Sequence, residues 1–245
     1  MVERGADTLT PKGERTRARI LEAALRLFAR EGYEATTLRA IAAEAGCSLG
    51  LAYRYFATKE DLVLALYLRL AHDLDDIVRA LPPAPLGERF TATMRAKLDL
   101  LTPHRAALAA LFGAALDRDS ALAVLGGATA GVRATVERAF VLAVEGATDA
   151  PGGVRNLMLA RVLYGLHLIL VLAWLQDRSP DARATGDLLL LVRDAVALAV
   201  PLLDTAPAEE ALERLARALE PFVGTGGPQG TAHGRGQSRR RTTER

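Results

Sequence analysis

Residues 37–62 of the chain read TLRAIAAEAGCSLGLAYRYFATKEDL, and this stretch decides the fold of the N-terminal part. Its pattern predicts two short helices, residues 38–45 and 48–56, with Thr37 as the cap of the first. Gly46 between them supplies the positive φ that a tight turn requires. Ala42, four residues earlier, is small enough for the second helix to cross closely. The stretch therefore predicts a helix-turn-helix.

Longer helices are expected on both sides of this motif. Residues 14–31 repeat apolar side chains at helical spacing and stop at Gly32, a good helix terminator. Residues 59–81 follow Thr58, whose hydroxyl can form a capping box with Asp61. The side chains expected to form the core beneath the motif are Ile20, Leu27, Phe28, Ile41, Ala45, Ala52 and Phe56.

The opposite face of the second short helix carries polar and small side chains that suit a DNA duplex. Hydroxyls and a lysine can reach phosphate oxygens, and short side chains at a helix start let the backbone approach base edges. The residues on this face are Ser48, Leu49, Tyr53 and Tyr55, followed by Lys59. The alternative is that the two tyrosines pack as half-buried aromatics and that Lys59 is a solvated charge.

Taken together, these motifs resemble the N-terminal DNA-binding domain of the TetR family of bacterial one-component regulators. The matching elements are Thr36-Thr37, Ile41-Ala42-x-x-Ala45-Gly46, Ser48-x-Gly50, Tyr53-Arg54-Tyr55-Phe56 and Lys59-Glu60-x-Leu62, preceded by the amphipathic first helix. The resemblance implies a homodimer that binds palindromic operator DNA and is released when a small molecule enters the C-terminal domain.

The resemblance also implies roles for individual residues. Thr37 would contact a phosphate, and Tyr55 and Lys59 would contact the DNA backbone. The residues expected near the bases are Ser48, Leu49, Gly50, Leu51 and Tyr53. Leu51-Ala52 departs from the commoner family pattern, so the operator sequence does not transfer.

Composition favours an all-α chain with no membrane span. Of the 245 residues, 50% are hydrophobic, mostly Ala and Leu, and few are the β-branched types that sheets favour. Cys47, the single cysteine, cannot form an internal disulfide, and the first residues lack the apolar core of a signal peptide. The most apolar segment, residues 162–175, is shorter than the roughly 20 residues of a membrane span. We therefore expect a cytoplasmic protein.

Charge and glycine content divide the chain further. The 31 basic and 29 acidic residues give a net charge of +2, with an acidic body between basic ends. We expect a disordered N-terminus at 1–13, the DNA-binding domain at 14–60, a ligand-binding and dimerisation domain at 61–223, and a disordered basic tail at 224–245. Arg239, Arg240 and Arg241 in the tail could form a solvated end or add nonspecific phosphate contacts.

The larger domain is predicted to be helical throughout and without catalytic, cofactor or metal-binding residues. Its expected helices are residues 86–101, 104–116, 128–144, 154–176, 184–203 and 208–222. The segments 154–176 and 184–203 are apolar on more than one side, so we expect them to bury this surplus against a second copy of the chain.

An aromatic stripe in segment 154–176 is either part of an ordinary core or the lining of a ligand pocket. Such a pocket would hold a hydrophobic or weakly polar effector, and no single charged residue there identifies the effector. The candidate lining residues of this stripe are Tyr164, His167 and Trp174. The resemblance to the TetR family implies a pocket that also reaches the preceding helices, with the candidates Met94, Leu98, Phe112, Leu116, Val136 and Phe140.

Two other functions remain open. The chain could be a helical ligand-binding protein or small enzyme with a vestigial DNA-binding end, or a partner-binding module without sequence-specific DNA binding. The favoured hypothesis is a transcriptional regulator, specifically a repressor, in which an effector tilts helix 59–81 and changes the separation of the two DNA-reading helices.

Overall fold

The structure, a computed structural model, describes residues 10–223, and within that range it contains helices and no β-strand. The predicted all-α class is confirmed. The α-helices are α1 (Pro11–Glu31), α2 (Leu38–Glu44), α3 (Leu49–Tyr55), α4 (Lys59–Arg79), α5 (Leu86–Leu101), α6 (Arg105–Leu116), α7 (Ala130–Glu145), α8 (Gly153–Gln176), α9 (Arg183–Ala199) and α10 (Ala206–Val223). The 3-10 helices are η1 (Thr102–His104), η2 (Pro180–Ala182) and η3 (Val200–Asp204). The tail predicted at 224–245 lies outside the described residues.

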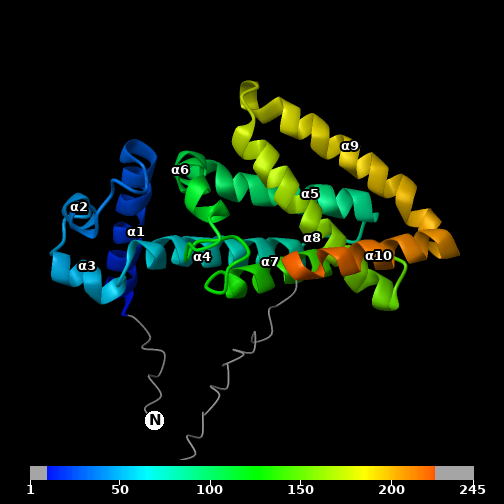
Figure 1. The fold of residues 1–245 in the computed structure, drawn as a ribbon, viewed down its shortest axis with the longest axis horizontal. Coiled ribbons are helices and arrows are strands. Elements are labelled where there is room, and N and C mark those ends of the chain that lie inside the picture. The colour runs from blue at the N-terminus through cyan, green and yellow to red at the C-terminus, as the bar shows by residue number, and fades with distance from the viewer. Residues whose placement is uncertain (1–9, 224–245) are drawn as a thin grey trace, which may run out of the picture.

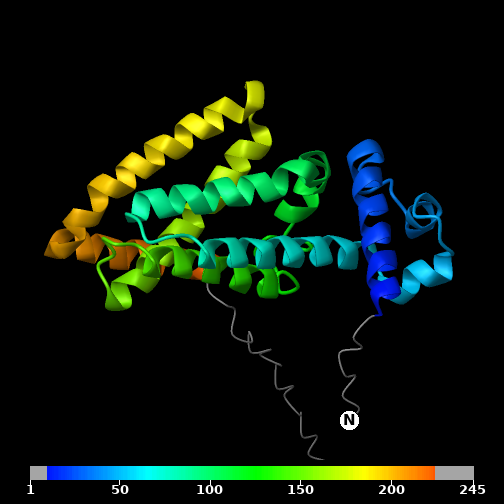
Figure 2. The ribbon, with the colours of Figure 1, turned by 180° about the vertical axis from the view of Figure 1, so that it is seen from behind.

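The helices form a small N-terminal unit and a larger body. Helices α1 to α3 gather at one end of the molecule, and α4 runs from them into the larger body (Figure 1). There α4 packs against α7 and α5, while α8 packs against α7 and α10. Seen from behind, α6 lies between α1 and the rest of the larger body (Figure 2). The N-terminal unit therefore contacts the larger body through both α4 and α6.

Two hydrophobic cores run through the described residues. The N-terminal core includes Phe28 and Phe56 but also Leu111 of α6 and Trp174 of α8. The C-terminal core is built around Phe90, Met94, Phe140 and Tyr164, among others. The N-terminal core thus extends beyond residues 14–60 and includes side chains from the larger body.

Helix α1 begins earlier than we expected. It starts at Pro11, and the Thr10 hydroxyl accepts a hydrogen bond from the Gly13 amide at 3.2 Å. Proline is favoured in the first turn because its fixed φ suits a helix and its missing N–H needs no partner there. Residues 11–13 are therefore helical, and our expectation of disorder was wrong for them.

The helices near the C-terminus also differ from the expected boundaries. We expected one helix over 184–203, but α9 ends at Ala199 and the 3-10 helix η3 continues to Asp204. Pro201 explains the break, because proline lacks an amide donor and disfavours helical backbone before it. By length and composition alone, α8 could cross a membrane, since it is longer than the apolar segment we identified. It packs against α7 and α10 within the helical body.

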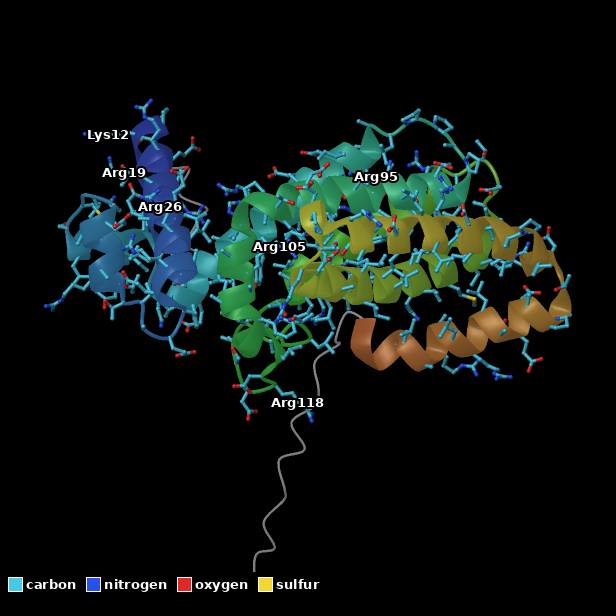
Figure 3. All side chains as sticks on the ribbon, turned by 90° about the horizontal axis from the view of Figure 1, so that it is seen from above. Lys12, Arg19, Arg26, Arg95, Arg105 and Arg118 are labelled. Atoms are coloured by element: carbon cyan, nitrogen blue, oxygen red, sulfur yellow. The ribbon has the colours of Figure 1, made fainter. Side chains whose placement is uncertain are left out.

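Two arginines tie helix ends together. Arg89 of α5 is buried and donates to the carbonyls of Leu81 and Pro82 after α4 and of Leu142 and Ala143 near the end of α7. Terminal helix carbonyls lack partners within their own helix, so one guanidinium satisfies carbonyls near the end of α7 and, at the same time, carbonyls of the segment after α4. Arg105 of α6, labelled in Figure 3, donates to carbonyls at the end of α8 and lies over the Trp174 ring.

Candidate functional site

Helices α2 and α3 form the predicted helix-turn-helix. Gly46 has φ +63°, as the turn requires, and the Cys47 amide donates to the Ala42 carbonyl at 3.0 Å. Ala42 itself is 2% exposed, consistent with the small side chain expected where the two helices meet.

One face of the motif is buried and packs toward the N-terminal core. The side chains predicted to lie there are all buried, namely Ile20, Leu27, Phe28, Ile41, Ala45, Ala52 and Phe56. Burial of these apolar side chains fixes the rotation of α3 about its own axis. The opposite face of α3 is therefore held toward solvent.

Two hydroxyls mark the starts of α2 and α3. Thr37 Oγ1 accepts from the Ala40 amide at 3.1 Å, and Ser48 Oγ accepts from the Leu51 amide at 3.2 Å. Both side chains are exposed. A capping oxygen accepts through a lone pair, so each O–H still has a proton to donate. Both residues can thus cap a helix and donate to a phosphate at the same time.

The exposed face of α3 combines a large aromatic side chain with a bare stretch of backbone. Tyr53 is 51% exposed, and Leu49 and Leu51 are partly exposed. A Cβ added to Gly50 would meet nothing within 4 Å. Packing within the chain therefore gives no reason for a glycine at position 50, whereas close approach of another molecule does.

Tyr55 and Lys59 lie differently from Tyr53. Tyr55 is half-buried against the N-terminal core. The Lys59 ammonium donates to the Tyr33 carbonyl at 2.8 Å and lies 4.4 Å from the centre of the Tyr33 ring. It also donates to the Glu34 carbonyl at 3.4 Å, so two of its three N–H groups bind the segment after α1. Lys59 thus joins α4 to the end of α1 and retains one donor.

Additional cations in the N-terminal unit were not among our predicted contacts. Arg17 of α1 lies 4.9 Å from the centre of the Phe56 ring, which brings the first half of α1 to the end of α3. Lys12 and Arg19 are exposed on α1 (Figure 3), and Arg54 is exposed on α3. Their charge is the sequence signal, and of the four only Lys12 lies outside the helices predicted at 14–31 and 48–56.

The interior of the larger body brings most of the predicted pocket residues together. Met94, Val136, Phe140 and Tyr164 are buried in the C-terminal core. His167 is 2% exposed, and its ring centre lies 4.8 Å from that of Phe140 and 4.5 Å from that of Tyr164. Trp174 belongs to the N-terminal core, against which Leu98 packs, and Phe112 is half-buried on α6.

Leu116 does not join this group. It is 60% exposed at the last position of α6, where the chain leaves the helix. The family resemblance placed Leu116 near the pocket together with Phe112, but at the end of α6 its side chain is left largely uncovered. Our expectation that Leu116 lines the interior was wrong.

Two helices of the larger body leave large apolar side chains in contact with solvent. Ile169 of α8 is 62% exposed, while Leu191 and Leu198 of α9 are 65% and 75% exposed. Isolated exposed leucines are common on protein surfaces, but several on two neighbouring apolar helices favour a surface that another molecule covers.

A helix-turn-helix that buries one face and exposes polar groups on the other is characteristic of DNA-binding proteins. Residues 20–66 match the family described as bacterial regulatory proteins, tetR family. The chain is 29% identical over 197 residues to the transcriptional repressor KstR of Rhodococcus jostii, covering 77% of this chain and 86% of that protein. The structure matches a tetR-family regulator from Streptomyces coelicolor with a TM-score of 0.56 at 25% identity, covering 88% of this chain and 92% of the other. Residues 20–66 thus match the DNA-binding segment of the tetR family, and the rest of the chain is similar in sequence and fold to regulators of that family.

A second similarity is higher but shorter. The chain is 42% identical over 69 residues to the transcriptional regulator HbdR of Aromatoleum, covering 28% of this chain and 29% of that relative. The chain thus matches less than a third of the length of HbdR. The similarity concerns one segment, and the activity of the whole relative does not follow from it.

Proposed function

We propose that this protein is a transcriptional repressor that binds palindromic operator DNA as a homodimer and is released by a small effector. The observation that carries the proposal is the division of α3 into two faces. Ala52 is fully buried, while Tyr53 is 51% exposed and Gly50 leaves the backbone uncovered. Such a helix can enter the major groove, with Thr37 and Ser48 donating to phosphates and the start of α3 next to the bases.

Homodimerisation is part of this proposal because a palindrome presents two half-sites. Two copies of α3 must meet successive major grooves about 34–36 Å apart, or a multiple of that distance. The exposed apolar side chains of α8 and α9, Ile169, Leu191 and Leu198, support an interface formed by these helices. Covering the same surface on both copies gives the two-fold symmetry that the operator needs.

Release by the effector would work through the contacts between the N-terminal unit and the larger body. Tyr33 donates to Glu60 at 2.5 Å, and both line a hollow of about 580 Å³ together with residues of α6 such as Gly113. A ligand that separates helices of the larger body would shift α4 and α6 and with them the two copies of α3. Moving a two-state equilibrium from 1:99 to 99:1 takes about 5.5 kcal/mol of differential binding. With two ligands bound per dimer, each would supply about half of this differential binding free energy.

The proposal places the protein in the cytoplasm, with DNA as its partner and without catalytic activity. The relatives named above, regulators by their names and titles, support this. The remaining alternatives are a helical ligand-binding protein and a partner-binding module, neither of which would distinguish one DNA sequence from another.

Fluorescence anisotropy with DNA from upstream of the protein's own gene separates these functions. We expect tight binding to one fragment, much weaker binding to a scrambled fragment, and affinity that falls steeply between two salt concentrations because phosphate contacts release counterions. Equal affinity for both fragments would contradict a sequence-specific repressor. Loss of tight binding on adding an effector tests the release step.

A further inference from the structure

Arg54 carries the charge on the face of α3 that points away from the N-terminal core. Ala52 is 0% exposed, so its side chain marks the direction of the core. An α-helix turns by about 100° per residue, which places Gly50 and Arg54, two positions before and after Ala52, each about 160° from that direction. Both residues are exposed. Arg54 and the bare backbone at Gly50 therefore form the middle of the solvent-facing side of α3.

Arg54 has no counter-ion in the part of the chain that the structure describes. Within residues 37–58 the acidic side chain is Glu44, and it is paired with α1. Arg26 lies 3.2 Å from one oxygen of the Glu44 carboxylate, and Arg30 lies 3.7 Å from the other. Arg54 takes part in none of the ion pairs of the described N-terminal unit. Its guanidinium N–H donors are therefore available to another molecule.

The space beside Arg54 is open. In a helix, a long side chain leans toward the N-terminal end and covers the turn before its own Cα, which for Arg54 is the turn that contains Gly50. A Cβ built at Gly50 would meet nothing within 4 Å. The guanidinium can thus extend along the uncovered backbone toward the start of α3 without displacing another side chain.

The alternative is that Arg54 serves only α3 itself. It lies in the last turn of that helix, where a cation interacts favourably with the helix dipole. This interaction is weak at an exposed position, and it is available to a cation on any side of the helix. It therefore does not account for the position of Arg54 opposite Ala52 and one turn after Gly50.

We propose that Arg54 reads a guanine in each half-site of the operator, donating bidentately to the O6 and N7 atoms of the base in the major groove. The planar guanidinium matches these two acceptors, and this pairing is the commonest base-specific contact of arginine with DNA. Gly50 lets the backbone of α3 approach closely enough for the side chain to reach the base edge. This inference rests on the proposed repressor function and names a base pair, G·C, that the operator must contain.

The position of Arg54 favours a base edge over a phosphate. The hydroxyls proposed to donate to phosphates, those of Thr37 and Ser48, cap the starts of α2 and α3. Arg54 instead lies in the middle of the exposed face, which in a helix seated in the major groove is the part nearest the base edges. Leu49 and Leu51 flank this face and are partly exposed, so they can contact thymine methyl groups.

Fluorescence anisotropy with altered operators tests the proposal. In each operator one guanine per half-site is replaced by 7-deazaguanine, which lacks the N7 acceptor but keeps its base pairing, or its G·C pair is replaced by A·T. We expect one position at which the A·T change weakens wild-type binding about tenfold or more and 7-deazaguanine weakens it to a smaller extent. Arg54→Ala should bind the unaltered operator about tenfold more weakly and lose nothing further at that position.

Two controls accompany Arg54→Ala. Arg95→Ala removes an exposed cation from α5 in the larger body (Figure 3) and should bind every operator like the wild type. The melting temperature of Arg54→Ala should stay near that of the wild type, because the side chain is exposed and alanine favours a helix. A lower melting temperature with unchanged discrimination among the operators would mean that Arg54 serves the helix alone, and the inference would be wrong.

The inference and the repressor function can be told apart by their failures. If Arg54→Ala still discriminates at every guanine, or if no guanine matters to the wild type, the inference is wrong while tight binding of the unaltered operator leaves the repressor function standing. A uniform loss of affinity on all operators would make Arg54 a phosphate contact. If the wild type does not distinguish upstream DNA from a scrambled fragment, the repressor function is wrong and the inference fails with it.

Discussion

Gly50 is the residue whose identity is explained by what lies outside the chain. A methyl group there would meet open space within the protein, and alanine favours helix over glycine by up to about 1 kcal/mol. We therefore expect Gly50→Ala to raise the free energy of unfolding slightly. The same methyl would stand between the α3 backbone and the bases, so operator affinity should fall about tenfold or more.

Urea denaturation and operator titration on the same preparation check both effects of Gly50→Ala. Gly131→Ala is the control, because a Cβ at Gly131 on α7 also meets open space, far along the chain from the motif. It should bind operator like the wild type. Undiminished operator affinity of Gly50→Ala would remove Gly50 from the interface.

At the residue scale, the sequence predicts the core side chains of the motif but not every hydrogen-bond partner of its polar residues. Ile41, Ala52 and Phe56 could be assigned to the core because helical spacing and the Gly46 turn fix their direction. The Tyr33 carbonyl beside Lys59 could not be predicted, because that contact depends on how α1 meets α4.

At the scale of helices, Gly146 is where α7 ends against α5. A Cβ on Gly146 would lie 2.4 Å from the guanidinium of Arg89, although its φ of −84° suits alanine. We expect Gly146→Ala to displace Arg89 from the Leu142 and Ala143 carbonyls and to lower the free energy of unfolding by about 1–3 kcal/mol. Gly131→Ala on the same helix should not lower it. Chemical denaturation compares the two, and equal stability of Gly146→Ala and wild type would contradict the role given to Arg89.

Helix positions followed from local sequence, while their ends depended on particular residues. The helix at 86–101 was predicted with the observed bounds because Pro85 and Thr102-Pro103 delimit it. The break at Pro201 was foreseeable from the missing amide donor, yet the apolar run through Leu203 concealed it. The exposed end of α6 at Leu116 was not foreseeable, because exposure depends on which helices lie nearby.

At the scale of the whole molecule, the proposed dimer links the larger body to DNA binding, because it sets the positions of the two copies of α3. We expect the double variant Leu191→Glu, Leu198→Glu to be monomeric yet folded, because both side chains are exposed in the single chain. Light scattering with size-exclusion chromatography measures its mass, and circular dichroism its helicity. Leu125→Glu, at a 47% exposed position between α6 and α7, should remain dimeric. A wild-type monomer, or a double variant that stays dimeric, would contradict the interface.

In the proposed repressor, the exposed face of α3 reads an operator from a two-fold dimer. Hydroxyl-radical footprinting of the wild type on the DNA upstream of its own gene tests it most directly, with Tyr53→Ala alongside. We predict two protected half-sites related by a palindrome, with centres about 34–36 Å apart or a multiple of that distance, and no protection with Tyr53→Ala. Uniform protection without half-sites, or an unchanged footprint in Tyr53→Ala, would contradict the claim.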